Sequence, residues 1–268
     1  MHKELKSIHP DAKLGKNVIV EPFSTISADV EIGEGTWVGP NVTIMDGARI
    51  GKNCKIFPGA VISAVPQDLK FKGENSIAQI GDNTIIRECV TVNRGTASRG
   101  KTQVGNNCLL MAYVHVAHDC FIGDYCILVN YVGLAGEVEV EEHVIIGGMT
   151  AVHQFSKIGA HSMIGGTSKI RKDVPPYIKA SKDPLSYIGI NSVGLRRRNF
   201  SADIIYNIND TYRIIYQKGL NTTNAIKKVE EAIPASPERD KIINFIRTSE
   251  RGIIKSCAVG SEEEEDEL

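Results

Sequence analysis

Aliphatic residues recur at every sixth position along most of this chain, from Ile8 to Ile170. A helix repeats about every 3.6 residues and a strand every two, so neither element alone explains a strict period of six. A hexapeptide period is typical of a parallel β-helix, a solenoid in which each repeat packs its apolar residue against the next coil. The positions are Ile8, Leu14, Val20, Ile26, Ile32, Val38, Ile44, Ile50, Ile56, Ile62, Ile80, Ile86, Val92, Val104, Leu110, Val116, Ile122, Leu128, Leu134, Val140, Ile146, Val152, Ile158, Ile164 and Ile170.

The other positions of each hexad support the same fold. The residue after the aliphatic one is often glycine, and the fifth residue is usually small or β-branched. Four cysteines occupy that fifth position, where we expect small buried side chains at a corner of the coil, not metal ligands or nucleophiles. They are Cys54, Cys108, Cys120 and Cys126. Cys89 and Cys257 lie outside this pattern.

The repeat divides the chain into three parts. Residues 1–177 are predicted to form a left-handed parallel β-helix, interrupted by insertions at Ser63–Gln79 and Ala97–Gln103 and ended by Pro175-Pro176. Insertions in solenoids tend to project on one side and to line a binding face. Residues 178–256 are predicted to form a small helical domain that covers the open end of the solenoid. Residues 257–268 are an acidic tail, which we expect to be disordered.

Helical spacing of apolar residues defines the predicted C-terminal domain. Ser201 is a candidate N-cap for a first helix that Gly219 ends. Thr223 opens a second helix, and Ser236, followed by proline and glutamate, opens a third. The fold is therefore expected to be mainly β with a helical cap.

The composition narrows the possible classes of protein. The chain has 268 residues, a net charge of −1 and 6% aromatic residues, and a near-zero charge argues against nucleic-acid binding. The start, MHKELKSIHPDAK, lacks the apolar region of a signal peptide. No stretch approaches the run of about 18 apolar residues that a transmembrane helix needs. Six cysteines without a disulfide-like framework fit a reducing compartment, so we expect a cytoplasmic protein.

The period also predicts which distant residues meet. Three hexads make one three-sided coil, so residues 18 apart lie on adjacent rungs, about 4.8 Å apart. This places His118 next to Gly136, and Gly136 next to Gln154. His115 and His153 fall on the same few rungs. His118 is the third residue of its hexad, which points out of the coil, and Asp119 follows it directly.

Two chemistries fit these residues. Three neutral imidazoles from neighbouring coils could hold zinc, as in a carbonic anhydrase-like enzyme, although the histidine spacing here is not that of the zinc enzymes. Alternatively, one imidazole could act as a general base in acyl transfer while a backbone N–H stabilises the oxyanion. The expected pairing of His118 with Gly136 favours acyl transfer, since glycine lets a thioester carbonyl approach the chain closely. A non-enzymatic scaffold offers no reason for His118, Asp119 and Gly136 to converge.

Several motifs accompany the repeat. They are PQDLK (Pro66–Lys70), NRGT (Asn93–Thr96), HVAHDC (His115–Cys120), GGMTAVHQF (Gly147–Phe155), DVPPY (Asp173–Tyr177) and GLRRRNFS (Gly194–Ser201). Together with the hexads and the helical cap, they resemble the UDP-N-acetylglucosamine O-acyltransferase family over residues 1–255. A later N-acyltransferase of the same pathway carries an additional N-terminal uridine-binding domain. Because the hexads begin at Ile8, we expect no such domain here.

The resemblance implies a reaction and an assembly. The reaction is transfer of an (R)-3-hydroxyacyl group from acyl carrier protein to the 3-hydroxyl of UDP-N-acetylglucosamine, the first step of lipid A biosynthesis. The assembly is a homotrimer with active sites in clefts between neighbouring solenoids. No cofactor, metal, nucleic acid or membrane span is implied.

The resemblance also assigns residues. His118 matches the general base, Asp119 the acid that assists it, and Gly136 the residue whose N–H forms the oxyanion hole. The positions that match substrate-binding residues are Asp68, Lys70, His115, His153 and Gln154, with Asn191, Arg197 and Arg198 reaching the nucleotide. Gly166 matches the position that closes the far end of the acyl groove. Because glycine has no side chain to block the groove, this position predicts a long acyl group, about C14 or beyond.

Three positions depart from the family pattern. Asn93 and Glu137 stand where histidines are common, and Val193 stands where a glutamate often lies near the nucleotide. The base and the oxyanion glycine are intact, so we expect the chemistry to be retained. The identity of the acceptor sugar stays open. A sugar with an amine at C3, or with a different substituent at C2, would present different groups to positions 93 and 137.

Overall fold

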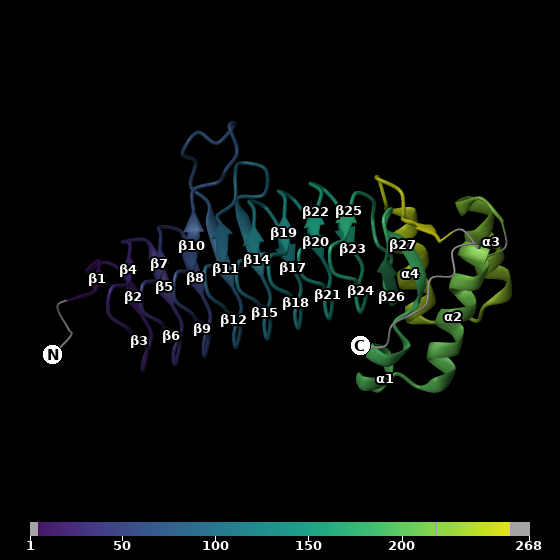
Figure 1. Ribbon diagram of the computed structural model, residues 1–268, viewed down its shortest axis with the longest axis horizontal. Helices are drawn as coiled ribbons and strands as arrows, with labels where there is room; N and C mark the ends of the chain where they lie inside the picture. Colours follow the sequence, from purple (N-terminus) through teal and green to yellow (C-terminus); the bar gives the residue numbers. More distant parts are fainter. Residues whose placement is uncertain (1–4, 218, 258–268) are drawn as a thin grey trace.

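The computed structural model describes residues 5–217 and 219–257, which form a left-handed parallel β-helix that ends in a cluster of helices (Figure 1). Three parallel sheets of short strands make the three walls of the helix. The first sheet contains β1 (Ser7–Ile8), β4 (Thr25–Ile26), β7 (Thr43–Ile44), β10 (Val61–Ala64), β13 (Thr91–Asn93), β16 (His115–Val116), β19 (Gly133–Leu134), β22 (Ala151–Val152) and β25 (Lys169–Ile170). The second contains β2 (Lys13–Leu14), β5 (Val30–Ile32), β8 (Ala48–Ile50), β11 (Ile77–Ile80), β14 (Lys101–Val104), β17 (Phe121–Ile122), β20 (Glu139–Val140) and β23 (Lys157–Ile158).

The third sheet runs beyond the solenoid into the C-terminal region. It contains β3 (Ile19–Val20), β6 (Trp37–Val38), β9 (Lys55–Ile56), β12 (Ile85–Ile86), β15 (Leu109–Leu110), β18 (Ile127–Leu128), β21 (Ile145–Ile146), β24 (Met163–Ile164), β26 (Ile178–Ser181), β27 (Ser186–Ile190) and β28 (Lys255–Ser256). Strand β26 pairs with β24 in parallel, and β27 returns antiparallel to β26. Hydrogen bonding of this sheet therefore crosses the predicted division at residue 177.

The interior of the solenoid is built by the predicted hexads. Every aliphatic hexad position is buried except Ile8, which is half-buried, and Leu14, which is 37% exposed. These two lie in the first coil, where no earlier coil covers them. Cys54, Cys108, Cys120 and Cys126 are buried and unpaired, which confirms their expected role. Burial raises the pKa of the Cys120 thiol to about 12, so this thiol is not a nucleophile near neutral pH.

Four-residue turns join the sheets and form three long corners of the prism. The first corner joins the first sheet to the second and includes residues 117–120, 135–138 and 153–156. The second corner joins the second sheet to the third and includes residues 123–126, 141–144 and 159–162. The third corner joins the third sheet to the first and includes residues 129–132, 147–150 and 165–168. In most hexads the fourth residue has a positive φ, which Asn and Asp tolerate best among residues with a side chain. Early coils use Asn17, Asn41 and Asn53 there, whereas later coils use larger side chains such as Tyr131, which stacks on Tyr113 with ring centroids 4.9 Å apart.

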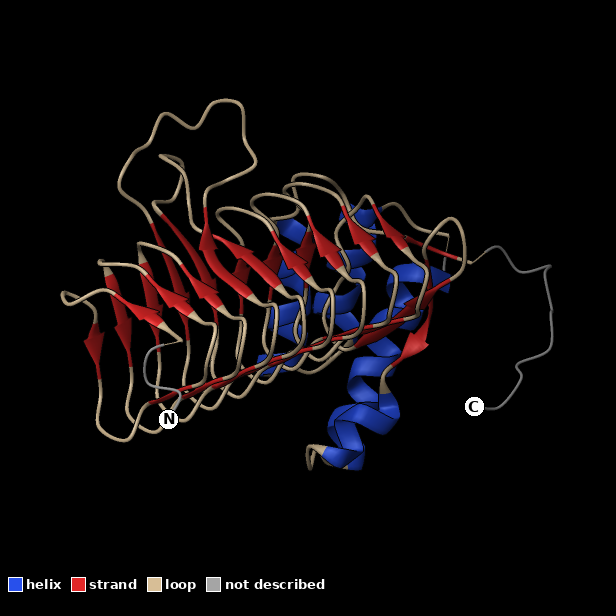
Figure 2. Cartoon of the chain, turned by 60° about the vertical axis from the view of Figure 1, so that its left-hand side comes forward, coloured by secondary structure: helices blue, strands red, loops and turns tan. Residues whose placement is uncertain are grey.

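Both insertions leave the solenoid on the same side, as predicted, and stand above its wall (Figure 2). The first comprises residues 65–76, because β10 continues to Ala64 and β11 begins at Ile77. The second comprises residues 94–100, between β13 and β14. Their bases are joined, since the Arg94 N–H donates to the Ala64 carbonyl and the Asn93 amide donates to the Val65 carbonyl.

In the described part of the C-terminal region, four helices close the end of the solenoid: α1 (Ser192–Arg197), α2 (Ala202–Gln217), α3 (Thr222–Ala232) and α4 (Pro237–Arg247). The Ser201 and Ser236 hydroxyls accept N-cap hydrogen bonds, as predicted, but the N-cap of α3 is Asn221, before the predicted Thr223. The short α1 was not predicted. The buried Tyr212 hydroxyl donates to the Pro176 carbonyl at 2.6 Å and ties α2 to the last coil. Residues 258–268 of the acidic tail lie outside the described residues.

Within the described ranges, 5–217 and 219–257, no helix has the length and hydrophobicity that crossing a membrane requires.

Candidate active site

The first corner brings together the histidines that the period placed there. His115 on β16 pairs with Gly133 on β19, and Gly133 pairs with Ala151 on β22. The turns that follow these strands carry His118, Gly136 and Gln154 in one row. The predicted stacking of these residues on successive rungs is therefore confirmed.

His118 is held by Asp119, the next residue along the chain. The His118 Nδ1 atom lies 2.8 Å from Asp119 Oδ2. The Asp119 oxygens also accept hydrogen bonds from the Thr96 N–H, the Thr96 hydroxyl and the Arg99 N–H. Because a carboxylate surrounded by donors acts only as an acceptor, the hydrogen of a neutral His118 ring belongs on Nδ1, and Nε2 carries the free lone pair.

The second insertion builds this support for the base. Thr96 and Arg99 lie on that loop, and the Asp119 N–H donates to Thr102 at the start of β14. Asp119 is fully buried and His118 is only 9% exposed. His118 thus lies outside the aliphatic core, as predicted, but it is largely covered, because the loop and the next coil close around it. The contribution of Thr96 was missed, since an insertion has no period from which to infer its contacts.

Gly136 lies against the His118 ring. A Cβ atom placed on Gly136 would lie 2.5 Å from His118 Cε1 and 2.6 Å from Nε2. Such distances are shorter than any normal contact, so a side chain at this position would displace the imidazole. Among the described residues, no group accepts a hydrogen bond from the Gly136 N–H. The N–H is therefore free to stabilise a charge that develops beside His118.

Two further histidines border the site. His115 Nδ1 lies 2.7 Å from the Thr91 hydroxyl, and burial lowers the pKa of His115, which favours its neutral form. His153 is exposed, and its Nδ1 atom lies 3.2 Å from Arg251 Nη2. Arg251 was not among the predicted site residues, because it comes from the segment after α4. Gln154 is half-buried in the same turn as His153.

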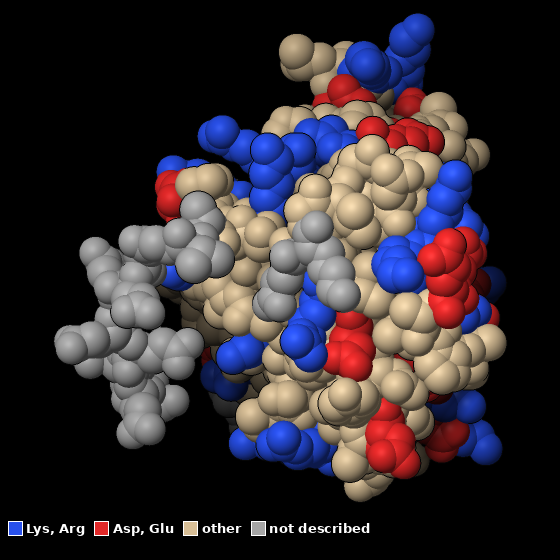
Figure 3. Space-filling model, turned by 90° about the vertical axis from the view of Figure 1, so that its right-hand side faces the viewer, with Lys and Arg blue, Asp and Glu red and all other residues tan. Residues whose placement is uncertain are grey.

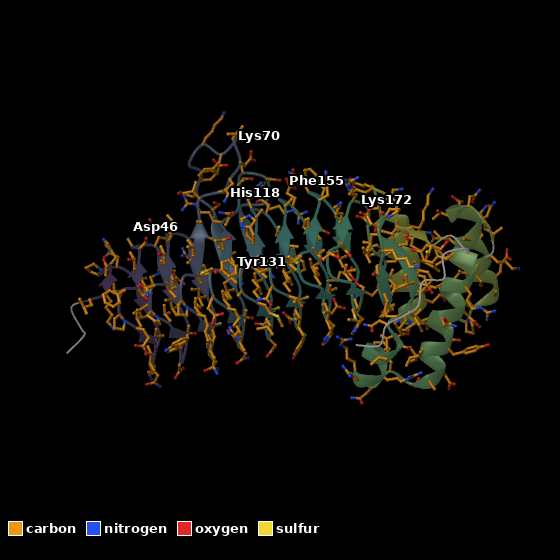
Figure 4. All side chains as sticks on the ribbon, viewed as in Figure 1. Asp46, Lys70, His118, Tyr131, Phe155 and Lys172 are labelled. Carbon is orange, nitrogen blue, oxygen red and sulfur yellow. The ribbon has the colours of Figure 1, made fainter. Side chains whose placement is uncertain are left out.

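Asp68 and Lys70 lie on the first insertion, which projects from the first corner. The Lys70 N–H donates to the Asp68 carboxylate at 3.0 Å, and the Lys70 side chain extends from the loop (Figure 4). Leu69 between them is fully exposed. Within a single chain, Asp68 and Lys70 are not part of the hydrogen-bond network of His118 and Asp119.

The predicted nucleotide residues lie at a different corner from His118. Arg198 Nη2 donates to the His143 carbonyl at the second corner, 3.2 Å away. Asn191 caps α1 through the Gly194 N–H, and its amide donates to the His161 carbonyl. Arg197 is exposed on α1. A single chain therefore does not bring Arg197 and Arg198 to His118.

Stacked rings support this second corner. Tyr125, His143 and His161 stack at centroid distances of 4.7 and 4.8 Å, and Phe200 packs edge-on against His161. Burial, with smaller contributions from nearby His143 and Arg198, lowers the pKa of His161 to about 4. His161 is therefore neutral at physiological pH, so this ring of the stack places no positive charge beside Arg198.

Gly166 lies at the third corner, one rung from Gly148. A Cβ atom on Gly166 would lie 3.2 Å from the Gly148 carbonyl oxygen, which is tight but leaves room for adjustment. Exposed Tyr113, Tyr131 and Met149 line the same corner. His118, Arg198 and Gly166 thus occupy three different corners of one solenoid.

The three departures from the family pattern have distinct surroundings. Asn93 is buried beneath the loops with its Oδ1 atom unpaired, although its amide nitrogen is bonded to Val65. Glu137 lies 3.9 Å from Arg99, and Val193 is exposed on α1. In the part of the chain that the structure describes, no three His, Cys, Asp or Glu side chains cluster as metal ligands do.

Two known family models match segments of this chain. A model described as UDP N-acetylglucosamine O-acyltransferase, domain 2, matches residues 173–254. A model of the bacterial transferase hexapeptide matches residues 29–64 and 101–136.

Individual relatives match over nearly the full length. An acyl-[acyl-carrier-protein]–UDP-N-acetylglucosamine O-acyltransferase of Sulfurihydrogenibium sp. is 56% identical and covers 92% of this chain and 93% of its own. The enzyme of that name from Chlorobaculum parvum is also 56% identical and covers 92% of this chain and 97% of its own. The structure of a UDP-N-acetylglucosamine acyltransferase from Bacteroides fragilis superimposes with a TM-score of 0.93 at 55% identity, over 95% of this chain and all of that chain. The fold, the hexads and these identities together show that this chain belongs to the UDP-N-acetylglucosamine O-acyltransferase family of enzymes.

Proposed function

We propose that this protein transfers an (R)-3-hydroxyacyl group from acyl carrier protein to the 3-hydroxyl of UDP-N-acetylglucosamine, in lipid A biosynthesis. The observation that carries the proposal is the His118–Asp119 pair beside the unpaired Gly136 N–H. The relatives' names supply the donor and the acceptor. An acyl-transfer assay with a panel of carrier-protein thioesters and UDP-sugars, including a 3-amino analogue, tests the proposal. No transfer to any UDP-sugar would contradict it.

The proposed reaction begins with the free Nε2 of His118. This atom accepts the proton of the sugar 3-hydroxyl as the oxygen attacks the thioester carbonyl, and Asp119 stabilises the imidazolium that results. The Gly136 N–H donates to the oxyanion of the tetrahedral intermediate. When the carbonyl re-forms, the carbon–sulfur bond breaks, and the thiolate takes the proton from His118. The products are the ester and the carrier thiol, and the base returns to its neutral form.

We further propose that sites form between chains of a trimer. The placement of His118 and Arg198 at different corners supports this, because two corners of one solenoid face different ways, whereas corners of adjacent solenoids can face each other. In this arrangement the first corner of one protomer meets the second corner of its partner. His118 then acts on a sugar whose phosphates are held by the partner's arginines, which bind phosphate oxygens with a planar fork.

Mixing two impaired variants tests the shared site. We expect the His118→Ala homotrimer to lose about 10² to 10⁴ in kcat, because it lacks the base. The Arg198→Ala homotrimer should bind the UDP-sugar about 10- to 150-fold more weakly, because loss of a charge-assisted contact costs about 1.5–3 kcal/mol. Mixed trimers should regain activity, since each contains one junction at which an intact His118 faces an intact Arg198. The measurement is turnover after co-refolding, with composition checked by native mass spectrometry. No recovery in verified mixed trimers would refute the shared site.

The acyl groove gives a separate prediction at Gly166. We expect the wild-type enzyme to prefer a long donor, about C14 or beyond, because no side chain at Gly166 closes the groove. Gly166→Met should shift the preference to shorter donors, while UDP-sugar binding stays unchanged. Competition between donors of different lengths, read by mass spectrometry of the product, measures both. A clear preference of the wild-type enzyme for a C10 donor would contradict the assignment.

A further inference from the structure

The two insertions contact each other beyond their bases. The Ile77 N–H donates to the Gly100 carbonyl at 3.0 Å, and the Arg94 guanidinium lies over the Phe71 ring, 5.5 Å from its centroid. Viewed from the helical end, charged side chains of both signs stand at the top of the molecule, the side from which the insertions project (Figure 3). The position of the second insertion therefore depends on that of the first.

Glu74, on the first insertion, joins the two insertions through its carboxylate. Its Oε2 atom accepts the Lys72 N–H at 2.8 Å across a turn at Gly73, where φ is 86°. Its Oε1 atom accepts the N–H of Ala97, on the second insertion, at 3.0 Å. Hydrogen bonds from its own N–H and from the Lys72 N–H, with a smaller contribution from Ala97, lower the pKa of Glu74, which favours the carboxylate. Both contacts are therefore charge-assisted.

Ala97 lies between the two residues whose N–H groups hold Asp119. The N–H groups of Thr96 and Arg99 donate to Asp119 Oδ1 at 3.0 and 3.2 Å. Backbone N–H groups that are close in sequence have directions fixed by the local backbone, so they bind anions as a unit. In this loop, residues 96 and 99 hold one carboxylate and residue 97 holds another. A shift of Ala97 would therefore shift the donors that hold Asp119.

The side chain of Arg99 holds the opposite side of the loop against the wall of the solenoid. Its Nη2 atom lies 2.6 Å from Glu139 Oε1 on β20, and Lys157 Nζ on β23 lies 3.5 Å from Glu139 Oε2. Partly exposed ion pairs between long side chains contribute little to stability. The partners of Glu74 are instead backbone groups, which cannot rotate away. We therefore assign the control of this loop to Glu74.

We propose that Glu74 is a positioning residue for His118, because it holds the second insertion in the conformation that presents its N–H groups to Asp119. This inference rests on the proposed function and adds a residue that acts through Asp119. The predicted substrate positions Asp68 and Lys70 lie on the same insertion as Glu74, so this contact also fixes where they stand relative to the base. Support behind the base matters, since a misplacement of about 1 Å can cost about 10²-fold in rate.

A double-mutant cycle with the base tests the positioning role. Glu74→Ala should lower kcat about tenfold, the lower end of the effect of losing a hydrogen bond to a charged group. In the His118→Ala background the same substitution should have no further effect on kcat, because two residues that act through one group are not additive. Multiplication of the two losses in the double variant, or an unchanged kcat in Glu74→Ala, overturns the proposal.

Two further variants separate positioning from folding. Glu74→Gln keeps a carbonyl oxygen that can accept the Ala97 N–H, so it should retain most of the wild-type kcat. Glu34→Ala removes an exposed carboxylate in an early coil and should leave kcat within about twofold of wild type. The melting temperature should change little in all of these variants. A marked loss of melting temperature in both Glu74 variants would make Glu74 a structural residue and overturn the proposal.

A second measurement does not depend on acyl transfer. In ¹⁵N-histidine-labelled protein, NMR signals of the ring nitrogens report which one carries the hydrogen, and comparison with His118→Ala assigns the His118 signals. We expect the hydrogen on Nδ1 in the wild type and a mixture of both tautomers in Glu74→Ala. An unchanged His118 ring in Glu74→Ala overturns the positioning role. The expected change in the ring, together with a wild-type enzyme that transfers no acyl group, would contradict only the proposed function.

Discussion

Replacing His118 with alanine is expected to lower kcat by about 10² to 10⁴, the usual contribution of a positioned general base. The substitution removes the only group that we place to accept the sugar proton, and it leaves the aliphatic core intact. Asp119 keeps its hydrogen bonds from Thr96 and Arg99, so its buried charge stays compensated. The melting temperature should therefore change little.

The control for this variant is another histidine of the same chain. His9→Ala removes an exposed imidazole near the start of the solenoid and should leave turnover unchanged. Steady-state kinetics and thermal unfolding, run on all three proteins, provide the comparison. Near-normal turnover of His118→Ala would show that the base lies elsewhere, and a collapse of the melting temperature would show that His118 is mainly structural.

Adding one methyl group at Gly136 should lower kcat almost as much as replacing His118 with alanine. From the sequence we expect a larger residue there to crowd the thioester carbonyl, but the structure shows that a Cβ atom meets the His118 imidazole first. Gly136→Ala should therefore displace the base, and a misplacement of about 1 Å can cost about 10²-fold in rate. The backbone N–H remains, and the nucleotide residues are at another corner, so the dissociation constant for the UDP-sugar should stay close to wild type.

Gly133→Ala is the matched control, since a Cβ atom on Gly133 has nothing within 4 Å and displaces no neighbour. Stopped-flow turnover and calorimetric binding of the UDP-sugar separate the two effects. If Gly136→Ala raised KM for the UDP-sugar and kept kcat, Gly136 would belong to the nucleotide site instead. A fully active Gly136→Ala enzyme would show that the ring adjusts without cost.

The hexads determined the fold and much of the candidate site. Each coil contains three hexads and stacks on the coil before it. Every third hexad therefore lies on the same wall, and two residues 18 positions apart are spatial neighbours. That rule predicts the row His118–Gly136–Gln154 and the pairing of His115 with Gly133, and the fifth position of the hexad predicts the buried cysteines. The helical cap followed from apolar spacing and from the capping hydroxyls of Ser201 and Ser236.

Other features depended on segments that have no repeat. The burial of Asp119 depends on Thr96 and Arg99, which lie on an insertion whose path no period describes. The contact of Arg251 with His153, and the position of Arg198 against His143, depend on how the C-terminal segments pack on the last coils. The corner occupied by Gly166 was contained in the sequence, since its hexad begins eight hexads after that of His118, and eight is not a multiple of three.

Periodic sequence therefore determined the prism, its rungs and the residues that share a rung, because stacking of equal coils is a local rule repeated along the axis. Only the tertiary structure decided which loop orients the base, how closely Gly136 approaches the His118 ring and which corner Arg198 and Arg251 of the C-terminal segments reach. These depend on contacts between segments far apart in sequence, whose geometry no short-range pattern specifies.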